Sequence, residues 1–180
     1  MGISDVDLCT VDLDWFSVDR SGNIAHFMSG GQGLIRNSNR VSRAELDSLL
    51  EYFSTLPDNH SEIRLDSLAR GNTEGMPKAK GLSDWAKRRY KAFLESVDRD
   101  GRRGIFVYDA MIASIIPVPY QRFVAPTRPL KLGEIPENVA TIVRRMAMPE
   151  VCFGQDKIID VRFCGNNDFP GSDEGPVESA

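Results

Sequence analysis

The stretch that most constrains this 180-residue chain is residues 14–28, with the sequence Asp-Trp-Phe-Ser-Val-Asp-Arg-Ser-Gly-Asn-Ile-Ala-His-Phe-Met. Two runs of aromatic and β-branched residues flank a turn that contains Gly22, and this pattern predicts a β-hairpin near the N-terminus. If the loop is residues 20–22, with Gly22 at a positive φ, the hairpin pairs Trp15 with Phe27, Phe16 with His26 and Val18 with Ile24. A two-residue loop would shift the register and change every pair.

Three later segments carry helix signals. A helix is predicted at about residues 43–55. It starts with a capping box, Ser-Arg-Ala-Glu at 42–45, in which the serine and the glutamate satisfy each other's backbone donors. A second helix is predicted from Asp84 to about Val97, ended by the sequence Asp-Arg-Asp-Gly101. A third is predicted to take Pro136 as its first residue, because proline suits that position of a helix.

Strands are predicted at residues 104–109, which are apolar on both faces and hence central, and at residues 120–125, 151–153 and 157–164. Residues 58–81 are predicted to form a long surface connection. The elements alternate irregularly and begin with a hairpin. This favours an α+β fold, with a mainly antiparallel sheet and about three helices on one face of it, over a doubly wound parallel sheet.

Composition bounds the class of protein. Hydrophobic residues make up 41% of the chain and charged residues 27%, which is typical of a globular protein. We expect a single domain over residues 1–164, followed by a disordered acidic tail over residues 165–180. No apolar run approaches the roughly 18 residues of a membrane span, and the first residues lack the features of a secretory signal. We therefore expect a cytoplasmic protein with no membrane partner.

The three cysteines, Cys9, Cys152 and Cys164, form no Cys-x-x-Cys pair and have no clustered histidines beside them. This spacing indicates neither a structural zinc site nor a disulfide framework, so we expect buried thiols and no cofactor.

Charge is distributed unevenly, and this indicates the kind of partner. The first nineteen residues contain five aspartates and no basic residue, whereas residues 78–103 contain nine Lys or Arg against four acids. The net charge of −4 gives no general attraction to nucleic acid, which we do not expect as a partner. The acidic segment instead favours another protein with a basic surface, and the sequence leaves the oligomeric state open.

The pair Asp12 and Asp14 is the strongest candidate for chemistry, since two carboxylates on one strand face can hold a hard cation. Enzymes of the haloacid-dehalogenase type begin with such a pair, but they follow it with small residues in a loop, whereas residues 15–18 here continue the strand. The glycine-rich residues 29–33 do not open directly into a helix, so they do not match a phosphate loop. The basic residues 87–91 are expected to form a solvated helix face. For His26 the sequence indicates no acid or thiol partner. We predict no catalytic residue and no metal ligand.

Three motifs carry a resemblance. Residues 14–31, then Arg-Gly-Ile-Phe-Val-Tyr-Asp at 103–109, then Pro-Tyr-x-Arg-x-x-x-Pro-x-x-Pro-Leu at 119–130, resemble a pattern in scattered bacterial proteins. Some of these are similar to immunity proteins, which neutralise toxins of neighbouring cells. The resemblance implies a non-enzymatic protein-binding module of bacterial origin, and it transfers no catalytic residue.

The leading hypothesis is therefore a protein-binding module, and its candidate contact residues are Asp12, Asp14, Trp15, Asp19 and His26. The alternative is a metal-dependent hydrolase that uses Asp12 and Asp14, with Asp109 as a further candidate.

Overall fold

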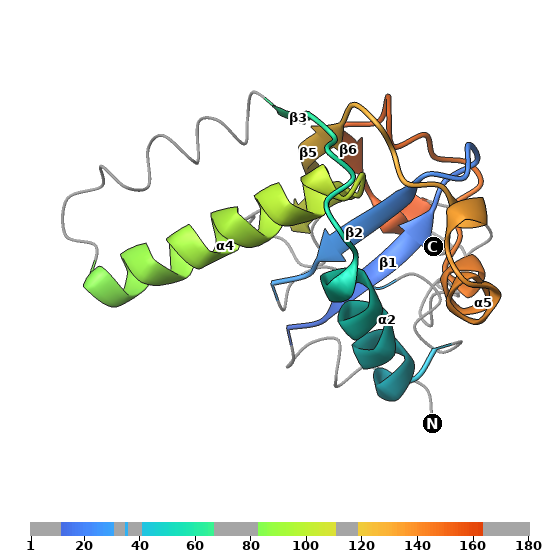
Figure 1. Cartoon of the computed structure of the whole chain (residues 1–180), viewed down its shortest axis with the longest axis horizontal. Coiled ribbons are helices and arrows are strands. Elements are labelled where there is room, and N and C mark those ends of the chain that lie inside the picture. The colour runs from blue at the N-terminus through green and yellow to red at the C-terminus, as the bar shows by residue number, and fades with distance from the viewer. Residues whose placement is uncertain (1–11, 31–34, 36–40, 67–82, 111–118, 164–180) are drawn as a thin grey trace, which may run out of the picture.

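The computed structural model describes residues 12–30, 35, 41–66, 83–110 and 119–163 (Figure 1). In chain order the elements are β1 (Asp14–Val18), β2 (Ile24–Met28), α2 (Arg43–Thr55), β3 (Ile63–Leu65), α4 (Asp84–Arg102), β4 (Phe106–Ala110), β5 (Tyr120–Pro126), the 3-10 helix Leu132–Glu134, α5 (Glu137–Arg145), β6 (Ile158–Ile159) and the 3-10 helix Val161–Phe163. The strands form one sheet in the order β1-β2-β4-β5-β3, with β6 paired to β5. The fold is α+β and starts with a hairpin, as predicted.

The hairpin has the predicted register. Trp15 pairs with Phe27, Phe16 with His26 and Val18 with Ile24. Gly22 adopts a φ of 75°, which a residue with a side chain rarely reaches, and its amide donates to the carbonyl of Asp19 at 3.0 Å. The predicted three-residue loop, residues 20–22, is confirmed.

The sheet is mixed, although most of its pairs are antiparallel. Only β2 and β4, among the described strands, run parallel, with His26 opposite Val107. A parallel pair needs a crossover, and this one contains α2, β3 and α4. β4 is central, as predicted, because it lies between β2 and β5.

Helices cover both faces of the sheet, so the prediction of helices on one face is wrong. Side chains alternate along a strand. Phe16 of β1 stacks on Phe53 of α2, and its cross-strand neighbour His26 meets Asp100 of α4, which places α2 and α4 on this face. On the opposite face the hydroxyl of Ser17 donates to the carbonyl of Met146, which directly follows α5. The two helices of the crossover, α2 and α4, thus cover one face of the sheet, and α5 covers the other.

The face next to α5 holds a row of stacked rings. Trp15 stacks on Phe27 at a centroid distance of 4.3 Å, and Phe27 stacks on Tyr108 at 4.9 Å, so that the row crosses β1, β2 and β4. All three side chains are fully buried. Aromatic pairs across neighbouring strands add to the stability that burial provides, and they fix the order of the three strands.

α4 is longer than predicted. It continues to Arg102, whereas the sequence placed its end near Val97 with Gly101 as the terminator. Gly101 instead lies within the helix against the sheet, where an added Cβ would sit 2.6 Å from Ile63 Cγ2 and 2.6 Å from Val124 Cγ1. The turn comes at Gly104, with a φ of 88°. Figure 1 shows the C-terminal part of α4 beside the sheet and its N-terminal part extending beyond it.

Two further predictions need correction. Residues 63–65, inside the predicted 58–81 connection, form β3 and pair with β5. Residues 151–153 are not a strand, and in the predicted strand 157–164 only 158–159 pair, with β5, before a 3-10 helix. Residues 151–153 are apolar because they are buried, and burial does not require a strand ladder.

The other helix predictions hold closely. α2 spans residues 43–55, and its capping box is present. α5 begins one residue later than predicted, with Pro136 as its N-cap. Cys152 is a buried free thiol, as expected. The predicted tail 165–180, Cys9, Cys164 and most of the 29–33 loop lie outside the described residues. Within the described residues, no helix has the length and apolar character needed to cross a membrane.

Candidate functional site

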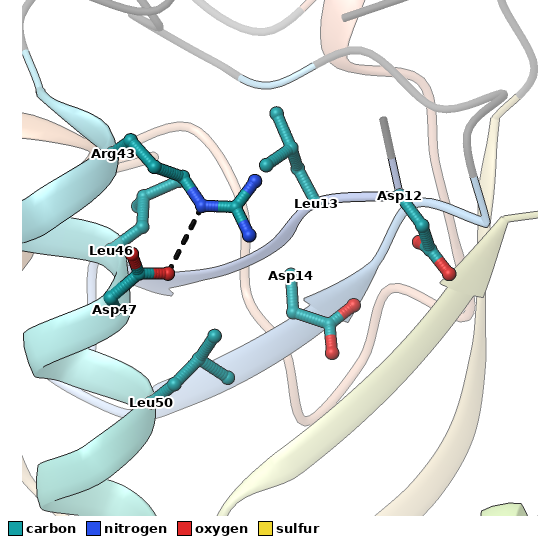
Figure 2. A pocket seen from close by; sticks show the side chains of 7 residues that line it. All are labelled: Asp12, Leu13, Asp14, Arg43, Leu46, Asp47 and Leu50. Carbon is teal, nitrogen blue, oxygen red and sulfur yellow. Dashed lines mark hydrogen bonds and ion pairs between the residues drawn. The ribbon is translucent and has the colours of Figure 1, made fainter. Parts of the chain in front are cut away.

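A small pocket opens where β1 begins and faces the N-terminal half of α2 (Figure 2). Its volume is about 120 Å³. Three leucines and four charged residues line it: Asp12, Leu13, Asp14, Arg43, Leu46, Asp47 and Leu50. The first three come from the start of the hairpin and the other four from α2, so the pocket lies between segments about thirty residues apart in the chain.

Local sequence signals position both walls. On one wall, the amide of Leu13 donates to Ser29 Oγ at 2.9 Å, and the Ser29 hydroxyl donates to Asp12 Oδ1 at 3.3 Å, so the residues before β1 are tied to the end of β2. On the other wall, the capping box fixes where α2 starts, because Ser42 N donates to Glu45 Oε2 at 2.7 Å. Glu45 also pairs with Arg145, and this ion pair ties α2 to the end of α5.

The charge of the lining is net acidic, with three carboxylates and one guanidinium. Arg43 Nε lies 3.0 Å from Asp47 Oδ1 in an exposed pair at i and i+4 of α2, drawn as a dashed line in Figure 2. This contact balances one carboxylate. The carboxylates of Asp12 and Asp14 lie on the opposite wall, where Asp12 is exposed and the side chain of Asp14 is 31% exposed. The wall formed by the hairpin therefore carries the negative charge.

Asp109 adds to this acidic edge. β1 begins, and β2 and β4 end, at the same edge of the sheet, since Asp14 lies opposite Met28 and Met28 opposite Asp109. The pKa of Asp109 is raised to about 6. Burial is the largest cause, a hydrogen bond with the Ala110 backbone partly offsets it, and the charges of Asp14 and Asp12 add to the rise. Repulsion between the carboxylates is therefore a smaller contribution to the raised pKa of Asp109 than its burial.

His26 lies behind Asp14 and is almost completely buried, with 4% of its surface exposed. Its Nδ1 is 2.8 Å from Asp100 Oδ2, and its Nε2 is 3.5 Å from Asp14 Oδ2. Burial by itself lowers the pKa of a histidine. Here the hydrogen bond with Asp100 and the proximity of Asp14 outweigh burial and raise the pKa of His26 to about 9. The ring is therefore an imidazolium at neutral pH.

Of the five predicted contact residues, the structure brings Asp12 and Asp14 together in the pocket, with His26 behind them. Trp15 is fully buried and donates from Nε1 to the Tyr120 hydroxyl at 3.1 Å. Asp19 is also buried, at the hairpin turn. Its carboxylate accepts from the backbone amides of Ser21, Asn23 and Phe153 at 2.8–2.9 Å. Trp15 and Asp19 therefore belong to the structural interior.

Sequence reasoning missed the α2 wall and the partner of His26. The capping box locates the first turn of α2, and the spacing of Leu46 and Leu50 shows one apolar stripe. Nothing local shows that this stripe meets the start of β1. Asp100 is 74 residues from His26, and its helical context does not indicate a buried partner.

Two other candidate sites are a metal centre and the basic face of α4. Among the described residues, no group of three or more His, Cys, Asp or Glu side chains could hold a metal ion. The basic residues 87–91 lie on α4, near Trp85, which is 60% exposed and carries Arg89 over its ring at 5.1 Å. This face makes exposed ion pairs with Asp84 and Glu95, which suits a solvated helix surface.

No protein-family model, curated protein or solved structure matches this chain.

Proposed function

We propose that this protein is a non-enzymatic protein-binding module whose acidic pocket receives one cationic side chain, Lys or Arg, of a partner protein. The observation that carries this proposal is the composition of the pocket: leucines on its walls and the carboxylates of Asp12 and Asp14 on one side.

The size of the pocket favours a side chain over a small-molecule substrate. Ligand and substrate sites usually measure roughly 300–1,000 Å³, whereas this pocket measures about 120 Å³. A recess of this size suits a single anchoring side chain, and such anchors carry much of the energy of a protein interface.

The chemistry of the lining favours a long basic side chain. Lys and Arg have an apolar stem and a charged head, and they bury the stem along apolar surface. Leu13, Leu46 and Leu50 offer that surface, and Asp12 and Asp14 offer acceptors for the head. An arginine should bind more tightly than a lysine, because its planar guanidinium can donate two hydrogen bonds to one carboxylate.

The three sequence motifs resemble scattered bacterial proteins, some of which are similar to immunity proteins, and from this we propose a toxin with a basic surface as the partner. Complementary charge speeds association and selects among partners. An immunity protein is encoded beside its toxin. The product of a neighbouring gene is therefore the first partner to test, with Asp12→Asn and Asp14→Asn variants as the comparison.

The pocket can be tested before any partner is known. The blocked tripeptide Gly-Arg-Gly is titrated into the labelled protein and followed by amide chemical shifts, with Gly-citrulline-Gly as its neutral isostere. We expect the arginine peptide alone to shift the amides of residues 12–14 and 46–50. The double variant Asp12→Asn with Asp14→Asn should lose at least about tenfold in affinity, because two charged acceptors are lost.

The matched control is Glu51→Gln, which removes one negative charge from an exposed position of α2 outside the pocket lining. This variant should retain nearly full affinity. Equal shifts with both peptides, or equal losses in Glu51→Gln and the pocket variant, would refute the pocket as a cation site.

The alternative is a hydrolase that holds a metal at Asp12 and Asp14, and the pairing of two carboxylates at one edge favours it. A metal that binds the native state alone raises the melting temperature by mass action. Melting curves with Mg²⁺, Mn²⁺, Ca²⁺ and Zn²⁺ therefore separate the two functions. An increase that disappears in Asp12→Asn with Asp14→Asn supports the enzyme, and unchanged curves support the binding module.

A further inference from the structure

His26 lies at a point where two carboxylates from different elements meet. It sits in the middle of β2 and stacks on Phe16 at a centroid distance of 4.5 Å. Asp14 comes from the start of β1 and Asp100 from the C-terminal part of α4. Nδ1 is hydrogen-bonded to Asp100, and Nε2 lies 3.5 Å from Asp14 Oδ2. Each nitrogen therefore has a carboxylate nearby, which favours the imidazolium, the form that carries a proton on both nitrogens.

The Asp100 side of this cluster is fixed. Asp100 Oδ1 lies 3.4 Å from Arg103 Nη1, and Arg103 is itself buried and donates to the carbonyls of Leu56 and Ser54. The ring is thus held through Nδ1 by a group that is anchored in the interior.

The Asp14 side is the adjustable one. Nε2 has no hydrogen-bond partner among the described residues, and Asp14 Oδ2 lies 3.5 Å away. Asp14 is also the member of the cluster that lines the pocket. A cation that enters the pocket and the buried imidazolium therefore act on the same carboxylate.

From this geometry we infer that His26 is the positioning residue of the pocket, and that a guanidinium at Asp14 and the Nε2 proton of the ring oppose each other, so that each binds less tightly when the other is present. The inference rests on the proposed cation pocket. Between about pH 8 and 9, where binding changes the protonation state of the ring, the imidazolium releases the Nε2 proton to solvent and the entering guanidinium replaces the lost positive charge. The other proton stays on Nδ1 with Asp100, and Nε2 becomes an acceptor beside Asp14.

Linkage then requires a pH dependence of a defined sign. A second cation beside Asp14 lowers the pKa of His26 below its free value of about 9. By reciprocity, deprotonation of His26 raises the affinity for the cation, so affinity increases as the pH rises through 9. A shift of one pKa unit corresponds to about a tenfold change in affinity.

Apart from His26 itself, the charged groups around the ring are not expected to change their charge near pH 9. Asp14 faces it from β1, and Asp100, with Arg103 behind it, faces it from the end of α4. On β4 the residue opposite His26 is the apolar Val107, and from α2 the apolar Phe53 stacks on Phe16. Asp109, further along β4, has a pKa of about 6 and titrates below this pH. An arginine probe keeps its charge throughout.

The test uses the histidine resonances of the whole protein between pH 6 and 10.5. The chain contains two histidines, His26 and His60, and His60→Gln assigns them and serves as the matched control. We expect His26 to titrate near pH 9 alone, about one unit lower with saturating Gly-Arg-Gly, and unchanged with Gly-citrulline-Gly. Asp14→Asn, without any peptide, should also lower the pKa of His26, because it removes one of the two carboxylates.

The second measurement is the affinity of Gly-Arg-Gly as a function of pH. It should increase about tenfold from pH 7.5 to 10 in the original protein and in His60→Gln, and stay flat in His26→Gln. If His26→Gln does not fold, the ring titration with and without peptide decides alone. Peptide binding without any change in the titration of His26 overturns this inference and leaves the pocket standing. No binding at any pH overturns the pocket and the linkage with it.

Discussion

Replacement of Gly101 by alanine tests the contact that brings α4 onto the sheet. Two effects oppose each other. Alanine is a better helix former than glycine by about 1 kcal/mol, so a solvent-exposed site would gain stability. The added Cβ, however, would lie 2.6 Å from Ile63 Cγ2 and 2.6 Å from Val124 Cγ1, closer than carbon atoms tolerate.

The steric term is the larger one. Overpacking of a tight interior typically costs about 1–3 kcal/mol. Both neighbours are β-branched side chains with few alternative rotamers, and they belong to two strands, β3 and β5, that pair with each other. We expect Gly101→Ala to lower the free energy of unfolding by a net 1–2 kcal/mol or so.

Urea denaturation followed by circular dichroism measures this loss. Gly154→Ala is the control, because a Cβ there meets nothing within 4 Å, and it should change stability by less than about 0.5 kcal/mol. Ile63→Ala should relieve the clash, so the double variant should be more stable than the two separate losses predict. A Gly101→Ala protein that is more stable than the original would refute the close approach of α4 to the sheet. It would also remove the reason why Asp100, the residue before Gly101, reaches His26.

Three further predictions concern buried carboxylates and the imidazole. Because the folded-state pKa of His26 is raised to about 9, protonation of His26 contributes about 3 kcal/mol to the free energy of unfolding, fully below pH 6.5 and progressively less as the pH rises to 9. The stability difference between the original protein and His26→Gln, measured from pH 6 to 10, should shrink over this range. A difference that stays constant contradicts the raised pKa. The pKa of the half-buried Asp109 is raised to about 6, so the folded state resists its ionisation. Asp109→Asn should therefore gain up to about 3 kcal/mol at pH 7 and nothing at pH 3 in urea titrations, and equal stabilities at pH 7 would contradict the raised pKa. Asp19→Ala removes the acceptor of three backbone amides and should cost about 2–4 kcal/mol, measured by thermal unfolding, whereas a surface role predicts a cost below about 0.5 kcal/mol.

The parts of the fold that could be predicted are those decided within a few residues. The hairpin register follows from Gly22, because only a residue without a side chain adopts its φ without strain. The start of α2 follows from Ser42 and Glu45, whose side chains satisfy backbone donors three residues away. Both signals are hydrogen-bond and steric rules that operate before any tertiary contact forms.

The failures share a different cause. Glycine is typical of a helix end, yet α4 continues past Gly101, because a residue without a side chain allows α4 to approach β3 and β5. Residues 63–65 form too short an apolar pattern to predict β3, which exists because β5 offers it a partner. In each case a distant element overrides the local preference.

The candidate site divides in the same way. The acidic character of residues 12–14 is evident in the sequence, and so is the apolar stripe of α2. The meeting of these two segments in a pocket, and the enclosure of His26 between Asp14 and Asp100, are decided by the packing of α2 and α4 on one face of the sheet. Local rules fix turns and helix starts because they act over a few bonds. The pKa of a buried ring depends on charges tens of residues away, and only the folded chain brings those charges within reach.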